Sequence, residues 1–406
     1  MRLRLFCKED AAIYMDQLEG FVTDPTKVCK LKRALYGLKQ SSRVWNIQLD
    51  EALQQFGLVR SKVDPCMYFS IGGEKMTFVT IYVDDFLVFT NDQEMKTKLK
   101  EFLNRRLKMK NQGEAKYCLG LRITRDRANG KLYLDQQAYI EDILRKFNMA
   151  NSNPVATPVD CGVKLDKSMC PTTLDQSKEM QNVPYQEAVG SLLYAAQATR
   201  PDIAFAVNLV SQFNSNPGKQ HWGAVKRIMR YLRGTADARL TFSKDGDQQF
   251  SGYVDADWGG DPDTAKSTTG YVFKKMGGAV SWRVKRQPSV ALSSCEAEFM
   301  ALSQAVQEAL WWQQLLAQIG VNDIVPLWCD NQSAICTARN EGFKPRTKHV
   351  SIRYHFVKDA VEKGDIQLGY ISTKQQPADG FTKPLTKQKH ETFRTLVGIV
   401  GYGGVL

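Results

Sequence analysis

Alternating hydrophobic and polar positions in the last third of the chain predict short strands separated by helices. Strands are expected over 250–255, 270–274, 279–282, 325–329 and 366–371, and helices over 294–317, 333–340 and 351–363, followed by a short helix. Ser293 and Glu296 have the spacing of a capping box, which places the start of the long helix. Three strands followed by alternating helices and strands predict an α/β domain with a mixed five-stranded sheet.

The first part of the chain has a different pattern. Apolar residues at helical spacing within 28–58 precede two β-rich runs at 77–83 and 86–90, which indicate a hairpin with Asp84 and Asp85 at its turn. A helix over 93–107 follows, and then two strands near 117–124 and 131–134, joined by a turn at Asn129-Gly130.

The middle of the chain is predicted to be helical. Prolines and many Asn, Ser, Thr and Asp residues at 150–183 are typical of an irregular linker. Helices are expected over 185–195 and 203–213, and a basic helix over 225–233 ends at Gly234.

Composition narrows the class of protein. A chain of 406 residues with 43% hydrophobic residues is long enough for two or three folded domains. Lys and Arg outnumber Asp and Glu by 55 to 43, a net charge of +12 that favours a polyanionic partner. Nine scattered cysteines without a CxxC pair indicate reduced thiols, and no apolar run reaches signal-peptide or transmembrane length. We therefore expect a soluble intracellular protein that is not secreted and not in a membrane.

Four carboxylates are the candidate catalytic groups. Asp255 ends a predicted strand, Glu298 lies in the first turns of the long helix, Asp330 follows another strand, and Asp379 begins a short helix. Carboxylates that converge from different elements can bind two Mg²⁺ or Mn²⁺ ions, which activate water and stabilise the leaving oxygen in phosphodiester cleavage. Two alternatives stay open: Asp257 lies on the same strand face as Asp255, and Glu296 could replace Glu298 as a ligand.

The four carboxylates, in this order, resemble the site of ribonuclease H, and the predicted topology resembles its fold. The whole chain from about 13 to 385 resembles the C-terminal half of the Pol polyprotein of copia-type LTR retrotransposons. The matching strings include Leu35-Tyr36-Gly37-Leu38-Lys39-Gln40, Tyr82-Val83-Asp84-Asp85, Thr199-Arg200-Pro201-Asp202-Ile203, Cys329-Asp330-Asn331-Gln332-Ser333 and Phe381-Thr382-Lys383-Pro384-Leu385. Many such strings in one order make the resemblance very specific.

The resemblance implies a division into four parts. Residues 1–110 correspond to a remnant of a reverse transcriptase palm, 111–245 to a thumb or connection region with the linker at 150–183, 246–390 to a ribonuclease H-like domain, and 391–406 to a tail. It implies that Asp84 and Asp85 are the metal-binding pair of the polymerase. It also implies nucleic-acid contacts for Lys39 and Gln40 and for the basic helix, which carries Lys226, Arg227 and Arg230.

The chain departs from the family pattern near its start. The third polymerase carboxylate lies upstream of Ile13-Tyr14-Met15 in the family, and Glu9 and Asp10 are too close to Tyr14 to replace it. We therefore expect that polymerase activity is lost. A smaller departure is Gly380, because the family has a larger apolar residue directly after the last aspartate. Glycine in a helix costs about 1 kcal/mol and is expected to loosen the segment that presents Asp379.

Histidine and basic residues between Asp330 and Asp379 add to the expected site. By the resemblance, His349 helps to protonate the leaving group or release product, with His355 as the alternative, and a phosphate-contacting or capping histidine is an equal reading. Arg346, Lys348 and Arg353 are expected to contact the substrate backbone.

The resemblance implies a function in retrotransposition. The expected activity is hydrolysis of the RNA strand of RNA–DNA hybrids with two Mg²⁺ or Mn²⁺ ions, and the expected partners are the hybrid, RNA and DNA. The expected location is the cytoplasm, virus-like particles or the nucleus. The alternative is a non-catalytic retrotransposon relic that only binds nucleic acid.

Overall fold

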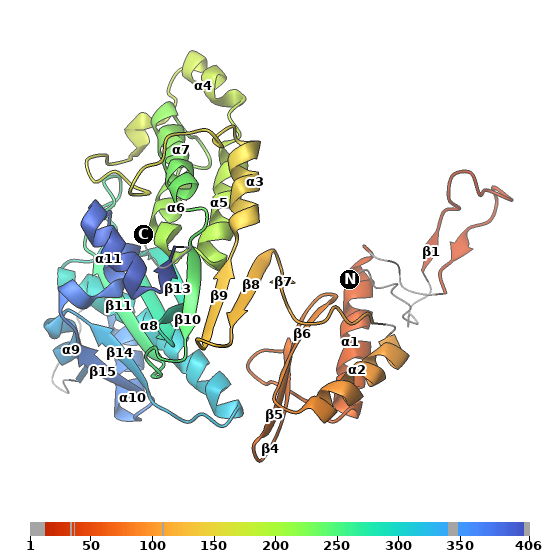
Figure 1. The fold of residues 1–406 in the computed structure, drawn as a ribbon. Coiled ribbons are helices and arrows are strands. Elements are labelled where there is room, and N and C mark those ends of the chain that lie inside the picture. Colours follow the sequence, from red (N-terminus) through yellow and green to blue (C-terminus); the bar gives the residue numbers. More distant parts are fainter. Residues whose placement is uncertain (1–12, 33–34, 36, 108, 340–347, 402–406) are drawn as a thin grey trace. The chain divides into compact units, whose positions relative to one another are not determined.

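The chain forms two compact units. The computed structural model describes residues 13–32, 35, 37–107, 109–339 and 348–401. Residues up to 115, together with 314–321, make the first unit, and residues 116–313 and 322–406 make the second. Each unit is described separately below, and Figure 1 labels the elements.

The first unit is an antiparallel sheet packed against two helices. The sheet has the order β3-β4-β5-β6. Its elements are β3 (Val59–Arg60), β4 (Met67–Gly72), β5 (Lys75–Tyr82), β6 (Asp85–Thr90), α1 (Lys39–Gln55) and α2 (Gln93–Leu107), with a short pair formed by β1 (Tyr14–Met15) and β2 (Cys29–Lys30). Trp45, Leu49 and Leu53 of α1 and Leu99 of α2 are buried in its core. The predicted hairpin and the predicted helix over 93–107 are therefore confirmed.

The second unit begins with a sheet and a helical bundle. Antiparallel strands run in the order β16-β10-β9-β8-β7, and helices from the segment between β9 and β10 form the bundle. The strands are β7 (Tyr117–Cys118), β8 (Leu121–Asp126), β9 (Lys131–Asp135), β10 (Arg239–Ser243) and β16 (Ile399–Val400); the helices are α3 (Gln137–Lys146), α4 (Leu174–Gln181), α5 (Tyr185–Ala198), α6 (Ala204–Ser211) and α7 (Lys219–Gly234). A buried apolar cluster from α3, α5, α6 and α7 holds the bundle together.

The expected irregular linker at 150–183 is not irregular throughout. It contains α4 and the 3-10 turn η1 (Lys167–Met169). A capping box starts α4, because the Thr173 hydroxyl accepts from the Gln176 backbone N–H (3.3 Å) and the Gln176 side chain accepts from the Thr173 backbone N–H. The prediction missed this Thr-x-x-Gln signal because prolines and polar residues dominate the segment.

The expected tail at 391–406 is also corrected within its described part. Helix α11 (Lys387–Leu396) buries Phe393, and β16 pairs with β10 through Ile399 opposite Leu240. Phe393, Val397 and Ile399 belong to one hydrophobic core with Leu240 of β10 and Val272 of the following sheet. The expected boundary at 245/246 therefore lies inside one compact unit. A two-residue strand is too short to show an alternating pattern in the sequence.

The second sheet of this unit is the mixed five-stranded sheet that the sequence predicts. Its order is β13-β12-β11-β14-β15, with β11 parallel to β14, β14 parallel to β15, and the other pairs antiparallel. The elements are β11 (Ser251–Asp257), β12 (Thr268–Lys275), β13 (Gly278–Arg286), β14 (Val325–Cys329), β15 (Ile366–Tyr370), α8 (Ser294–Gln318), α9 (Gln332–Arg339), α10 (Lys348–Glu362) and the 3-10 turns η2 (Pro201–Ile203), η3 (Thr373–Gln375) and η4 (Pro377–Phe381). The mixed five-stranded sheet and the order of strands and helices along the chain confirm the predicted ribonuclease H-like α/β domain.

A buried ion pair connects the bundle to the C-terminal helix. The Arg200 guanidinium donates to both carboxylate oxygens of Asp202 (2.9 and 2.7 Å) and to the carbonyl of Thr235 (2.8 Å), and both charged side chains are fully buried. The Tyr231 hydroxyl donates to Asp202 (2.6 Å), and the Asp202 carbonyl lies 3.2 Å from Nε2 of His390 in α11. Despite burial, the charge of Arg200 holds the pKa of Asp202 well below its usual range. The pair is thus fully hydrogen-bonded, as a buried pair must be.

We predict that Arg200→Met strongly destabilises the second unit. The substitution leaves Asp202 buried without its counter-charge, which typically costs about 3–5 kcal/mol. Chemical denaturation measures this loss, and the double variant Arg200→Met/Asp202→Leu should recover part of it. Arg145→Ala is the control, because it removes an exposed ion pair with Asp142. Equal effects of Arg200→Met and Arg145→Ala would contradict the prediction.

Candidate active site

Two aspartates meet at the carboxyl ends of adjacent parallel strands. Val254 of β11 pairs with Cys329 of β14, so Asp255 and Asp330, which follow these residues, reach the same edge of the sheet. Asp255 is 2% exposed and Asp330 is partly exposed. The cap of α9 is Asn331, whose side chain accepts from the backbone N–H of Ala334 (3.0 Å). Asp330 is therefore not needed as a helix cap.

The start of α8 distinguishes the two glutamates. The Ser293 hydroxyl accepts from the backbone N–H of Glu296 (3.1 Å), and the Glu296 carboxylate accepts from the backbone N–H of Leu292 (2.8 Å). Glu296 is thus used in the helix start. Glu298 is 6% exposed, and its Oε2 is buried without a hydrogen-bond partner among the described residues. Of the two, Glu298 has the free buried oxygen.

Asp379 is carried by η4, which packs tightly against the sheet next to Asp255. Gly270 of β12 lies opposite Asp255, and a Cβ at Gly270 would lie 2.7 Å from atoms of both Phe381 and Thr382. Glycine is therefore required there for the close approach of η4.

The expectation that Gly380 loosens the segment with Asp379 is wrong. Gly380 is buried, and a Cβ on it would lie 2.5 Å from the ring of Phe393 in α11. The small residue lets α11 pack directly on η4. Sequence reasoning failed here because it treated glycine only as a weak helix former and could not see the aromatic ring.

The four carboxylates form two overlapping groups of metal-ligand size. Ligand atoms of Asp255, Asp330 and Asp379 lie within 4.8 Å of one another, and so do those of Glu298, Cys329 and Asp330. These are the two groups of this kind in the described part of the chain, and they share Asp330. The Cys329 side chain is buried at the end of β14.

The alternative ligand Asp257 is not part of these groups. Its carboxylate lies over Gly260, where a Cβ would come within 1.5 Å of Oδ2. Asp257 therefore faces the turn after β11, whereas Asp255 faces the other carboxylates.

Burial and mutual repulsion give the cluster a strong preference for positive charge. Burial raises the pKa of Asp255 to about 7, and the charges of Asp379 and Asp330 act in the same direction. Burial also raises the pKa of Glu298 to about 9, again with neighbouring carboxylates adding to the effect. The pKa of Asp379 is raised mainly by burial. A cation at this place would favour the ionised carboxylates.

Two hydroxyl groups contact the aspartates, and a buried glutamine ties the neighbouring segment to the sheet. The buried Thr382 hydroxyl donates to Asp255, and the Thr373 hydroxyl donates to Asp330 (2.7 Å). Gln376, which is also buried, donates to the carbonyl of Val254 (2.9 Å) and so ties the segment before η4 to β11. These contacts restrict the directions in which the carboxylate oxygens point.

A lysine of the site was missed by sequence reasoning. Lys383 Nζ lies 3.0 Å from Asp379 and 3.9 Å from Asp255. The available signal was the i,i+4 spacing between Asp379 and Lys383, which is part of the matching string that begins at Phe381.

The donor set fits a hard divalent cation. Carboxylate oxygens are the ligands that Mg²⁺ and Mn²⁺ prefer, and here they come from β11, α8, η4 and the end of β14. The unpartnered Oε2 of Glu298 is a buried acceptor that needs a donor or a cation.

The aspartate pair of the first unit lies at a strained turn. Val83, between Tyr82 and Asp84, has φ of 52°, which is unusual for a β-branched residue. The indole N–H of Trp45 donates to the Val83 carbonyl (2.9 Å) and holds the turn. Burial, and then the charge of Asp85, raise the pKa of Asp84. Within the described residues, no third Asp, Glu, His or Cys joins Asp84 and Asp85 in a metal-sized group.

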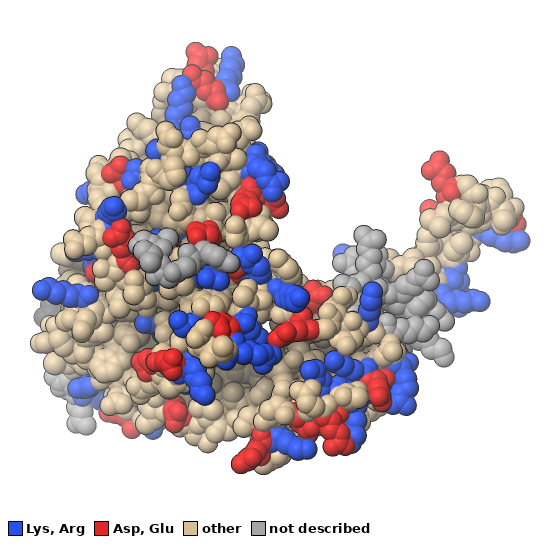
Figure 2. Space-filling view, in the orientation of Figure 1, with Lys and Arg blue, Asp and Glu red and all other residues tan. Residues whose placement is uncertain are grey.

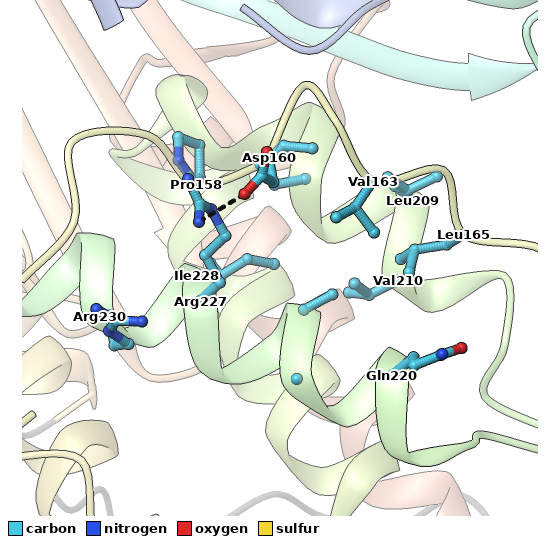
Figure 3. Close-up of a pocket in the computed structure, with 14 residues that line it drawn as sticks. Pro158, Asp160, Val163, Leu165, Leu209, Val210, Gln220, Arg227, Ile228 and Arg230 are labelled. Carbon is cyan, nitrogen blue, oxygen red and sulfur yellow. Dashed lines mark ion pairs between the residues drawn. The ribbon is translucent and has the colours of Figure 1, made fainter. Parts of the chain in front are cut away.

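Two arginines of the basic helix contact the chain itself. Arg227 forms an ion pair with Asp160 (3.2 Å) and donates to Thr157, and Arg230 donates to the carbonyl of Asn153 (2.7 Å). Figure 3 shows the Arg227–Asp160 pair at the edge of an apolar cavity of about 330 Å³ between α7 and the 158–165 segment. These contacts hold the 153–160 segment on α7, and the nucleic-acid role of Arg227 and Arg230 stays a prediction. Lys226 is exposed.

The remaining predicted contacts are distributed as follows. Lys39 and Gln40 are exposed at the start of α1. Arg353 is half-buried, and burial lowers its pKa while the charge of Glu296 opposes the change. Arg346 and the side chains of Lys348 and His349 lie outside the described residues, and His355 is exposed. Basic and acidic side chains are interspersed on the face shown in Figure 2.

No helix in the described ranges is both long and apolar enough to cross a membrane.

Comparison with known proteins identifies relatives along the chain. Residues 5–161 match the family model for reverse transcriptase (RNA-dependent DNA polymerase). The chain is 44% identical, over 95% of its length, to the retrovirus-related Pol polyprotein from transposon TNT 1-94 of Nicotiana tabacum, of which it spans 29%. It is 36% identical to the corresponding polyprotein from transposon RE1 of Arabidopsis thaliana, of which it spans 26%. The chain thus covers less than a third of these polyproteins.

The solved structures that match this chain have low sequence identity to it. A foamy viral protease-reverse transcriptase in complex with double-stranded DNA matches 85% of this chain and 51% of its own, with 14% identity and a TM-score of 0.45. Ribonuclease H1 from Halobacterium salinarum matches 33% of this chain and 94% of its own, with 16% identity and a TM-score of 0.25.

One relative is matched over nearly its whole length. The chain is 32% identical to a putative transposon Ty5-1 protein of Saccharomyces cerevisiae, with 74% of this chain and 96% of that protein aligned. Together with the plant polyproteins, this match shows that the chain belongs to the Pol polyproteins of copia-type LTR retrotransposons.

Proposed function

We propose that this chain hydrolyses the RNA strand of RNA–DNA hybrids at the site formed by Asp255, Glu298, Asp330 and Asp379. The convergence of these carboxylates from four elements on one sheet edge carries the proposal. The two overlapping groups that share Asp330 fit two neighbouring cation positions. Two Mg²⁺ or Mn²⁺ ions bound there would supply an activated water and stabilise the leaving 3′ oxygen.

The protein's own part in this reaction is to hold and orient the ligands. Thr382 and Thr373 fix the directions of the Asp255 and Asp330 carboxylates. Burial of Asp255 and Glu298 keeps water away from one side of the site and strengthens every charge interaction within it. The hybrid would be bound through phosphates and 2′-hydroxyls, with little sequence preference, and we propose that Lys226, Lys348 and Arg353 contribute contacts of this kind.

The first unit supports a second, weaker part of the proposal. Residues 5–161 match the reverse transcriptase family model, and Asp84 and Asp85 are presented at a turn anchored by Trp45. The described residues bring no third ligand to this pair. We propose that Asp84 and Asp85, with Lys39 and Gln40, are a polymerase remnant that does not act in this chain alone.

We predict metal-dependent cleavage of a 5′-labelled RNA annealed to DNA. Asp330→Asn should reduce the rate by at least about 100-fold with Mg²⁺ or Mn²⁺, because it removes a ligand common to both groups. Chelation by EDTA should abolish cleavage. Double-stranded RNA is the control substrate and should stay intact. If the folded protein binds the hybrid in Ca²⁺ but does not cleave it in Mg²⁺ or Mn²⁺, the non-catalytic alternative holds.

The two glutamates are expected to respond differently to the same substitution. Glu298→Gln should lower the rate on the order of 100-fold, because it removes a charged metal ligand. Its melting temperature should be unchanged or higher, because a buried carboxyl group with a raised pKa is replaced by a neutral amide. Glu296→Gln should keep most of the activity and change stability little, because the glutamine oxygen can accept the same hydrogen bond from Leu292. Rates and melting curves of both variants test this, and the reverse pattern would move the ligand role to Glu296.

Primer extension on an RNA template tests the polymerase remnant. We expect no extension by this chain with Mg²⁺ or Mn²⁺, because two carboxylates alone leave the cations under-coordinated. The hybrid-cleavage assay on the same preparation shows that the second unit is folded, and a circular dichroism comparison of Asp84→Asn with the wild type controls for changes in the first unit. Robust extension that is lost in Asp84→Asn would refute the expectation.

A further inference from the structure

Lys383 contacts the acidic cluster, and its side chain is partly exposed to solvent. Its Nζ is 3.0 Å from Oδ1 of Asp379 and 3.9 Å from Oδ2 of Asp255. The Lys383 side chain is 39% exposed, whereas those of Asp255 and Asp379 are 3% and 13% exposed. The ammonium group of Lys383 therefore lies at the boundary between the buried carboxylates and water.

Lys383 acts on the whole cluster. Its charge lowers the pKa of Asp255, of Glu298 and of Asp379 against the larger effect of burial. Lys389 in α11 lowers the pKa of Asp379 as well, but it is exposed and forms no ion pair closer than 4 Å to the cluster among the described contacts. Lys383 is thus the close counter-charge, and Lys389 is a more distant one.

The position of Lys383 conflicts with cation binding. A divalent cation binds a carboxylate oxygen at about 2.0–2.6 Å, and the Lys383 ammonium lies only 3.0 Å from Oδ1 of Asp379. Two positive charges within a few ångströms also repel each other strongly at a partly buried site. The lysine stem is long and flexible, so the ammonium can move into water when a cation arrives.

We propose that Lys383 is an internal counter-ion that takes the place of a divalent cation between Asp255 and Asp379 and is displaced when the cation binds. This inference rests on the proposed function, because it assumes that the cluster binds divalent cations. Its consequence is that Lys383 stabilises the cation-free fold and weakens cation affinity. The site then stays assembled between binding events.

The test is calorimetric titration of the full chain with Mn²⁺. We expect Lys383→Met to bind Mn²⁺ about tenfold more tightly than the wild type, because no ammonium has to be displaced. Without metal, the melting temperature of Lys383→Met should be lower than that of the wild type, and saturating Mn²⁺ should remove this difference. Lys389→Met makes the same charge change outside the cluster and should alter Mn²⁺ affinity much less.

Two results would overturn the inference. One is a Mn²⁺ affinity of Lys383→Met that is equal to or weaker than that of the wild type. The other is unchanged Mn²⁺ affinity with weaker binding of the hybrid in Ca²⁺, which would make Lys383 a phosphate contact. Asp330→Asn separates this failure from that of the proposed function: if the wild type binds no more Mn²⁺ than Asp330→Asn, the metal site itself is refuted.

A measurement on the wild-type chain covers the case in which Lys383→Met does not fold. Amine acetylation followed by peptide mass spectrometry reports how accessible each lysine is. Mg²⁺ or Mn²⁺ should increase the labelling rate of Lys383 severalfold relative to Lys389, because displacement moves the ammonium into water. A labelling ratio that does not change with the cation would overturn the inference.

Discussion

Mutual repulsion among buried carboxylates is the constraint on which this structure depends. Asp255, Asp330 and Asp379 have oxygens within 4.8 Å of one another, and Glu298 is joined to them through Asp330. Such a cluster stays folded only if the surrounding structure holds each carboxylate in place against its neighbours. Thr382 and Thr373 donate hydrogen bonds to Asp255 and Asp330, Gln376 ties the segment before η4 to β11, and Lys383 supplies one positive charge.

The packing around the cluster shows how the ligands are brought together. Two positions without a side chain, Gly270 and Gly380, allow η4 to lie directly between β12 and α11. Helix α11 is in turn connected to the buried Arg200–Asp202 pair through His390. A string of contacts thus extends from the helical bundle to Asp379, so the site belongs to the whole second unit rather than to one small domain.

Much of this arrangement is readable from the sequence, because it depends on local patterns. Helix α2 and strand β14 match their predicted ranges, and the ends of β11 and β14 bring Asp255 and Asp330 to one edge by the geometry of parallel strands. The Ser293 capping signal indicated the use of Glu296 in the helix start. The catalytic roles of these residues stay predictions. Contacts between distant segments were not readable: Arg227 with Asp160, Phe393 over Gly380, and Lys383 beside Asp255.

The pairing of β10 with β16 has a consequence for how the second unit assembles. During synthesis, β10 leaves the ribosome long before Ile399 and Val400, so one edge of its sheet has no partner while the whole five-stranded sheet of β11–β15 is made. An unpaired edge next to the apolar surface around Leu240 is a site for wrong strand pairing. Contacts between such distant positions also slow folding. Pairing of β16 with β10 therefore has to wait for the end of synthesis, when Phe393 of α11 can also pack over Gly380 of η4.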